Sequence, residues 1–252
     1  MNVSLYQAAA ALSANSRWQD VIAENLASGS VPGFRKQSLT VDAIQSGLLP
    51  ATGLNSLGSP QYFSLPKGSV STSFASGQLD YTGDDKSAAI EGKGFFQVQL
   101  ANGSIAATRD GEFQINSHGQ LVTKEGYTVM GQSGPIQLDV HNRDPISISA
   151  TGDVSQGSDV KGKLSLTDFS NPELLTNTNG VYFLADNPGL LKQPATGSVR
   201  EGFVESANTS SLGEMANMMT AMRGFEANQH VIQIQDDRLG KVISELGNPG
   251  SS

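Results

Sequence analysis

The chain has 252 residues, enough for one large β domain or two modest domains to bury a core without disulfides. It contains 16 basic and 24 acidic residues, and the resulting formal charge of −8 argues against a nucleic-acid partner. The absence of cysteine excludes thiol catalysis, disulfides and cysteine-bound zinc, and 28 glycines with only 16% charged residues favour strands and turns over solvated helices.

The first predicted element is an amphipathic helix within residues 1–30. Its segment from Ser4 to Ala27 contains no Pro or Gly, and apolar residues recur at helical spacing. Pro32 and the glycines on either side of it predict the end of the helix. The N-terminus lacks the basic start and continuous apolar stretch of a cleaved signal peptide, and no window reaches the ~18 apolar residues of a membrane-spanning helix, so we expect no membrane insertion.

Residues 31–76 are predicted to form an extended connector. Ser, Gly, Leu and Pro dominate from Ser38 to Ser76, and no helical or strand period is sustained there. We therefore expect weak regular structure in this segment.

Residues 77–203 are predicted to form an all-β domain. Apolar residues alternate with polar ones in short runs, and turn signals such as Asn102-Gly103 separate the runs. The pattern predicts at least seven short strands and is compatible with either a barrel or a sandwich.

A second long amphipathic helix is predicted within residues 204–252. Met215, Met219, Met222, Ile232 and Leu239 belong to its apolar stripe, which extends over more than eight turns on the helical period. A stripe of this kind needs a cover. It is provided either by the N-terminal helix of the same chain or by neighbouring molecules in an assembly.

We find no sequence pattern that predicts catalysis or cofactor binding. The three histidines are too scattered for a metal-ligand motif, and no nucleophile elbow or phosphate-binding loop occurs. The acidic cluster at residues 80–91 does not follow the calcium-loop spacing and indicates a solvated turn. We therefore predict no catalytic, cofactor-binding or metal-binding residue and no cofactor.

Four ordered blocks give the most specific signal. They comprise residues 25–35, with Asn25-Leu26-Ala27 and Pro32-Gly33-Phe34-Arg35, and then residues 82–98, 108–127 and 202–228. Together they resemble the flagellar rod and hook family of bacterial axial proteins, although Val31 stands where the family usually has Thr. Within this family, residues 146–166 are most similar to the proximal-rod branch and next to the distal-rod branch.

The resemblance implies a non-enzymatic, structural axial subunit of the flagellar basal-body rod. It implies a mainly β fold, with a central flagellar axial domain between two long terminal helices that polymerise and transmit torque. The implied partners are other rod and hook proteins, copies of the chain itself, and the flagellar type III export apparatus. The implied location is the periplasmic rod, reached without cleavage of a signal peptide.

The residues expected at the assembly interface follow from the two stripes and the exit of the first helix: Leu5, Leu12, Ile22, Asn25, Leu26, Pro32, Gly33, Met215, Met219, Met222, Ile232 and Leu239. Two other functions stay open at this stage. One is a secreted β-domain hydrolase of cell-wall polymer, and the other is a monomeric adhesin.

Overall fold

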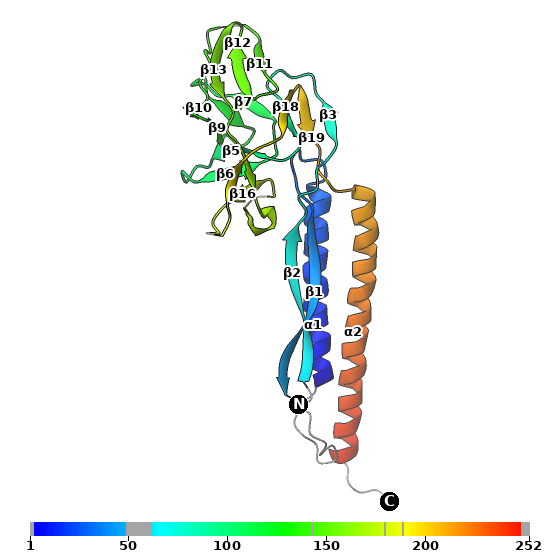
Figure 1. Cartoon of the computed structure of the whole chain (residues 1–252). Helices are drawn as coiled ribbons and strands as arrows, with labels where there is room; N and C mark the ends of the chain where they lie inside the picture. Colours follow the sequence, from blue (N-terminus) through cyan, green and yellow to red (C-terminus); the bar gives the residue numbers. More distant parts are fainter. Residues whose placement is uncertain (1–2, 49–61, 143, 179, 188, 248–252) are drawn as a thin grey trace, which may run out of the picture. The chain divides into compact units, whose positions relative to one another are not determined.

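The computed structural model describes residues 3–48, 62–142, 144–178, 180–187 and 189–247 (Figure 1). The chain divides into two compact units. The helical unit comprises Met1–Leu26, Gln37–Ser71 and Ser211–Ser252, and the β unit comprises Ala27–Lys36 and Thr72–Ser210. The chain therefore passes between the units four times.

The helical unit contains the two long helices. α1 spans Val3–Ala27 and α2 spans Ser211–Gly247. Both terminal helices are confirmed, but the second begins at Ser211, because residues 203–205 form a strand that belongs to the β unit. The helices approach each other where a Cβ on Gly224 would lie 2.8 Å from Nδ2 of Asn15.

The helical unit also contains strands β1 (Gln37–Leu48) and β2 (Tyr62–Thr72), which form a two-stranded sheet. The Ser38 and Ser71 hydroxyls lie 3.1 Å apart across it, and a Cβ on Gly68 would meet Leu39. These residues lie in the segment expected to be a weakly structured connector. Leu39, Val41 and Ala43 alternate with polar residues in β1, but this alternation is short and lies in a segment rich in serine and glycine, so the strands were not predicted.

The β unit is built from short strands joined by tight turns. Its strands are β3 (Leu79–Tyr81), β4 (Ala88–Glu91), β5 (Phe95–Gln99), β6 (Ile105–Thr108), β7 (Phe113–Ile115), β8 (Leu121–Thr123), β9 (Thr128–Gly131), β10 (Gly134–Pro135), β11 (Ile146–Ile148), β12 (Asp153–Gln156), β13 (Asp159–Lys163), β14 (Leu166–Phe169), β15 (Thr176–Asn177), β16 (Tyr182–Leu184), β17 (Lys192–Pro194), β18 (Ser198–Glu201) and β19 (Phe203–Glu205), with a 3₁₀ turn at Pro172–Leu174. The all-β centre is thus confirmed.

The largest sheet has the order β15-β16-β6-β5-β9-β8-β7, with β10, β14 and β17 paired beside this path. Its first and last strands do not pair with each other, so the described strands do not close into a barrel. A separate sheet has the order β11-β12-β13.

The core of the β unit lies around Phe96, Val98, Phe113, Leu121 and Val129, which are almost completely buried. Phe34 joins this core from the segment that follows α1 and is also buried. The residues just after the first helix are therefore part of the β unit by packing as well as by pairing.

The last strands of the β unit pair with its first strands. β18 is antiparallel to β4, with Val199 opposite Ile90, and β19 is antiparallel to β3, with Phe203 opposite Tyr81. This pairing brings the segment before α2 beside the segment after β2. It places Glu205, at the end of β19, inside the protein.

Candidate functional site

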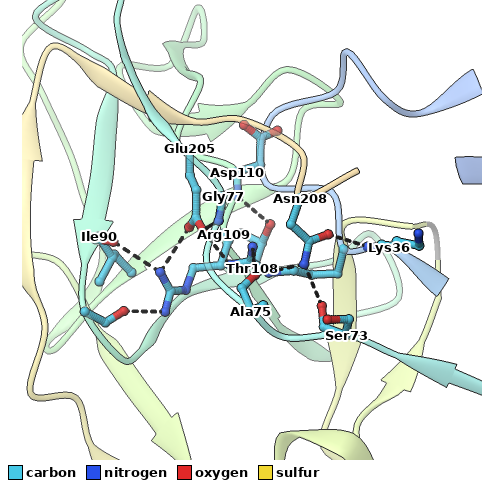
Figure 2. Close-up of polar contacts among 12 residues, drawn as sticks. Lys36, Ser73, Ala75, Gly77, Ile90, Thr108, Arg109, Asp110, Glu205 and Asn208 are labelled. Atoms are coloured by element: carbon cyan, nitrogen blue, oxygen red, sulfur yellow. Dashed lines mark hydrogen bonds and ion pairs between the residues drawn. The ribbon is translucent and has the colours of Figure 1, made fainter. Parts of the chain in front are cut away.

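A buried ion-pair cluster forms at the end of β19, and Glu205 is its centre (Figure 2). One carboxylate oxygen of Glu205 accepts hydrogen bonds from Nη2 of Arg35 at 2.8 Å and from the amide of Gly77 at 2.7 Å. The other oxygen accepts from Nη1 of Arg109 at 3.0 Å. We call Arg35, Arg109 and Glu205, together with Asn208, the clamp.

The two guanidinium groups of the clamp are bound by backbone carbonyls as well. Arg35 donates to Ala75 O at 3.0 Å, and Arg109 donates to Ile90 O at 3.1 Å and Gly92 O at 2.7 Å. All three charged side chains are at least nine-tenths buried. Two buried positive charges and one negative charge leave an excess of one positive charge, so these carbonyl dipoles contribute to stabilising the arginines.

Burial lowers the pKa of Arg109, and the neighbouring charge of Glu205 opposes this effect. Arg109 also lies over the ring of Phe95, with its Cζ 5.2 Å from the ring centre. An arginine keeps its proton in proteins, so the clamp carries fixed charges rather than a proton that could be exchanged during catalysis.

Two glycines allow the segments to approach each other closely at the clamp. Gly33 has a φ of 71°, and a Cβ there would lie 2.3 Å from the amide nitrogen of Asp110. Its own amide donates to Glu205 O at 2.7 Å. At Gly77 a Cβ would lie 1.9 Å from Ser206 O. Any larger residue at either position would separate these backbones.

The side-chain amide of Asn208 links two further segments (Figure 2). Its oxygen accepts from the amide of Lys36 at 2.6 Å, and its nitrogen donates to Ser73 O at 2.9 Å and Ala75 O at 2.8 Å. The amide of Ser73 also donates to Lys36 O at 2.8 Å. One asparagine therefore ties the segment after α1 and the segment after β2 to the segment before α2.

Asp110 lies beside the clamp in sequence and is 3% exposed. Burial raises its pKa to about 7, although its carboxylate accepts a hydrogen bond from the amide of Glu112 at 2.9 Å. Burial also raises the pKa of Tyr182, whose hydroxyl donates to Glu125. These groups form no arrangement of nucleophile and base. Among the described residues no group of histidine and acidic side chains is arranged to hold a metal ion.

The predicted interface residues near the N-terminus have different environments. Ile22 and Asn25 are buried within the chain, whereas Leu12, Leu26 and Pro32 are partly exposed. Asn25 donates to Gln37 O at 2.7 Å and accepts from the Gln37 amide at 2.8 Å, so it fixes the start of β1. Asn25 and Ile22 thus have partners inside the subunit. Leu5 lies in α1, but its side chain is outside the described residues.

The predicted interface residues of α2 are mostly exposed. Met215, Met219 and Met222 are 50%, 57% and 55% exposed, Leu239 is 40% exposed, and Ile232 is half-buried. The buried side of α2 includes Ala221 and Glu214 instead. The structure therefore separates an inner seam of α2 from an exposed methionine stripe, a distinction absent from the sequence prediction.

The sequence prediction also missed the clamp. Arg35, Arg109, Glu205 and Asn208 all lie in the blocks that carry the family resemblance, but the spacing of these blocks does not show that they meet. The sequence did contain a signal for a polar cluster, because each block combines a charged or amide side chain with a glycine or the end of a strand. Only the pairing of β19 with β3 makes them converge.

Comparisons with known proteins show the family of the chain. A family model described as "Flagellar hook protein FlgE/F/G D1 domain" matches residues 89–156, and one described as "Flagellar basal body rod FlgEFG protein C-terminal" matches residues 200–245. A relative from Buchnera aphidicola subsp. Baizongia pistaciae, named flagellar basal-body rod protein FlgG, is 32% identical over 95% of this chain and 98% of its own length. The chain belongs to the flagellar basal-body rod family.

Other rod proteins, named FlgF, have a comparable sequence identity to the chain. Flagellar basal-body rod protein FlgF of Escherichia coli strain K12 is 29% identical over 96% of this chain and 97% of its own length. FlgF of Mesorhizobium japonicum is 30% identical over 98% and 99%. The chain is thus a structural subunit of the flagellar basal-body rod and is not an enzyme. No described helix is long and apolar enough to cross a membrane.

Proposed function

We propose that this rod subunit polymerises through its terminal helices and transmits torque through their packed interfaces. The observation that supports this proposal best is the methionine stripe of α2, formed by Met215, Met219 and Met222 with Leu212 before them. Spacings of three and four residues place these side chains on one face of the helix. An exposed apolar stripe of this kind is typical of a protein–protein contact, and methionine adapts to neighbours of different shape.

The second half of α2 exposes apolar side chains as well. Val231 and Ile234 are 45% and 43% exposed. Val231 follows Met222 by nine residues, about two and a half helical turns, so it lies on the opposite side of α2, whereas Ile234 lies within about 60° of Met219 around the helix. Apolar side chains are therefore exposed on more than one face of α2, which suits an open helical assembly, in which each copy meets different surfaces of two neighbours.

Leu12, Leu26 and Pro32 remain candidates for the same interface, together with Ile232 and Leu239 of α2. The proposed partners are other rod and hook proteins and copies of this chain. We further propose export through the flagellar type III apparatus without signal cleavage, a periplasmic location, and a place in the proximal rod. The resemblance of residues 146–166 to the proximal-rod branch supports this last assignment.

The domain limits that we propose for this role follow the two compact units. The domain limits predicted from the sequence assign Arg35 and Ala75 to the connector (residues 31–76) and Glu205 to the C-terminal segment (residues 204–252). The hydrogen bonds that join these three residues to one another support assigning them to the β unit. The assembling part would then be the helical unit, and the β unit would be the outer module.

Complementation of a strain that lacks the gene tests the proposed function. The wild-type gene should restore motility and complete basal bodies in electron micrographs, whereas Met219→Asp, with a charge in the stripe, should restore neither. Met219→Leu is the matched control, because it changes the same position but keeps the exposed side chain apolar, and it should restore both. Full motility with Met219→Asp would contradict the proposed interface.

A further inference from the structure

The clamp joins segments of the β unit that adjoin three of the four crossings into the helical unit. The four crossings fall after residues 26, 36, 71 and 210, and the clamp lies beside the last three. Lys36, Ser73 and Asn208 lie within three residues of a crossing and are hydrogen-bonded to one another through the Asn208 amide. Arg35, Ala75 and Glu205 form a second layer one to three residues further into the β unit.

We propose that the clamp is a positioning device that holds these chain exits at fixed spacing, with Glu205 and Asn208 as its positioning residues. Through it, the places where the terminal segments leave the β unit are set by the β unit itself. In the rod subunit, the chain segments that lead into the helical unit would then leave the β unit at a fixed spacing from one another. The device is a property of the isolated chain, and only its consequence for assembly rests on the proposed function.

The chemistry of the clamp is better suited to fixing the positions of chain segments than to raising the overall stability of the β unit. A buried ion pair is seldom more stable than a well-packed apolar cluster of the same volume, because both charges must be desolvated. Hydrogen bonds, however, fix distances and directions that apolar contacts leave free. Glu205 uses its two oxygens on three donors from three segments, which are Arg35, Gly77 and Arg109.

Asn208 allows the device to be weakened without disturbing the core. It is only partly buried, and it lies outside the hydrophobic clusters of the β unit. Its side-chain bonds go to the backbone of Lys36, Ser73 and Ala75. Asn208→Ala removes these bonds and leaves the packing of β5 and β6 unchanged.

Amide hydrogen exchange on the full-length chain tests the positioning role. In Asn208→Ala we expect the amides of Lys36 and Ser73 to exchange at least about tenfold faster, while those of Val98 and Ala107 in β5 and β6 keep their wild-type rates. Asn102→Ala is the matched control, because Asn102 makes one side-chain bond to the Ser104 amide in an exposed turn. It should leave Lys36 and Ser73 unchanged.

Two results would overturn the proposal. Unchanged exchange at Lys36 and Ser73 would show that Asn208 does not hold the exits, and equal acceleration throughout the β unit would show a merely structural role. Asn208→Asp separates the bonds further. It keeps the acceptor for the Lys36 amide but loses the donor to the carbonyls of Ser73 and Ala75, so the Lys36 amide should exchange more slowly than in Asn208→Ala, and acceleration at Lys36 to the level of Asn208→Ala would contradict the bonding scheme.

Motility separates a failure of this inference from a failure of the proposed function. If the device matters for assembly, Asn208→Ala should fail to restore motility in the strain lacking the gene, while Asn102→Ala restores it. If the wild-type gene itself does not restore motility, the proposed function is wrong, and the exchange rates still decide whether the clamp holds the exits. Full motility with Asn208→Ala would contradict the link between the clamp and assembly.

Discussion

Glu205 is the residue on which the buried charges of the β unit depend. It is the counterion of both Arg35 and Arg109, at 2.8 and 3.0 Å. Glu205→Gln preserves the shape of the side chain but leaves both guanidinium groups without a compensating charge. We expect the free energy of unfolding of the chain to fall by roughly 3–5 kcal/mol, as measured by urea denaturation.

Glu91→Gln is the control for this substitution. Glu91 pairs with Arg200 at 2.8 Å, but both side chains are about half exposed, so the loss should be below about 1 kcal/mol. Equal losses in the two variants would show that the interior of the clamp is better solvated than the structure indicates.

Asp110 gives the β unit a pH dependence of its own. Its pKa is about 7 in the folded chain against an ordinary value of 3.8, so between these values the folded state retains a proton that the unfolded chain has released. The contribution of Asp110 to stability is therefore most favourable below pH ~4, declines as the pH rises to 7, and is constant above that. Asp110→Asn should remove this decline.

Unfolding free energies of the wild type and Asp110→Asn, measured from pH 4 to pH 8, test this assignment. Other carboxylates contribute equally to both curves, so the difference isolates Asp110. We expect the variant to gain stability relative to the wild type as the pH rises, with the largest gain, roughly a few kcal/mol, above pH 7. Parallel curves would exclude the proposed titration.

Gly33 is required by the close packing of two backbones. Gly33→Ala places a Cβ 2.3 Å from the Asp110 amide nitrogen in a residue whose φ is 71°, so both strain and overlap oppose it. Gly126→Ala has a similar φ of 86° but open space around the new methyl group. We expect thermal unfolding to show a loss of about 1 kcal/mol for Gly126→Ala and several kcal/mol for Gly33→Ala. Similar losses would contradict the close approach.

At the level of secondary-structure elements, the sequence predicts the helices and strands that are marked by a local pattern of residues. The two helices and the strands of the β unit follow from periodicity and turn residues, and even the end of α1 is predicted by Pro32. Strands β1 and β2 were missed because the alternation of Leu39, Val41 and Ala43 in β1 is short and the surrounding segment is rich in serine and glycine. The clamp was missed because Arg35 and Glu205 are 170 residues apart, and no local pattern reports a contact of that separation.

The two sides of α2 should respond differently to the same charge in the isolated subunit. Met219 is 57% exposed, whereas Ala221, two residues later, is fully buried. Met219→Asp should change the unfolding free energy by no more than about 0.5 kcal/mol, while Ala221→Asp should lower it by several kcal/mol, because a carboxylate would be buried without a partner.

Urea denaturation of both variants, followed by circular dichroism, measures these changes in the free energy of unfolding. The stability of Met219→Asp decides whether a loss of motility in this variant reflects failed assembly or failed folding. If Met219→Asp leaves the subunit stable but prevents rod formation, the stripe acts between molecules. A large loss of stability for Met219→Asp would instead mean that the methionine stripe packs within the single chain.

At the level of the whole molecule, the rod subunit consists of two units of different kind. The β unit has its own hydrophobic core and the buried ion pairs of the clamp. The helical unit exposes apolar side chains that a single copy leaves uncovered. The family match covers both parts, with residues 89–156 in the β unit and residues 200–245 extending from its last strands through α2.

Oxidative footprinting of Met215, Met219 and Met222 tests the central claim most directly. The same mild peroxide treatment is applied to the purified monomer and to isolated basal bodies, and sulfoxide is quantified at each methionine by mass spectrometry. We expect all three methionines to oxidise readily in the monomer and to be strongly protected in basal bodies. Equal oxidation in both samples would show that no neighbour covers the stripe and would contradict assembly through this face of α2.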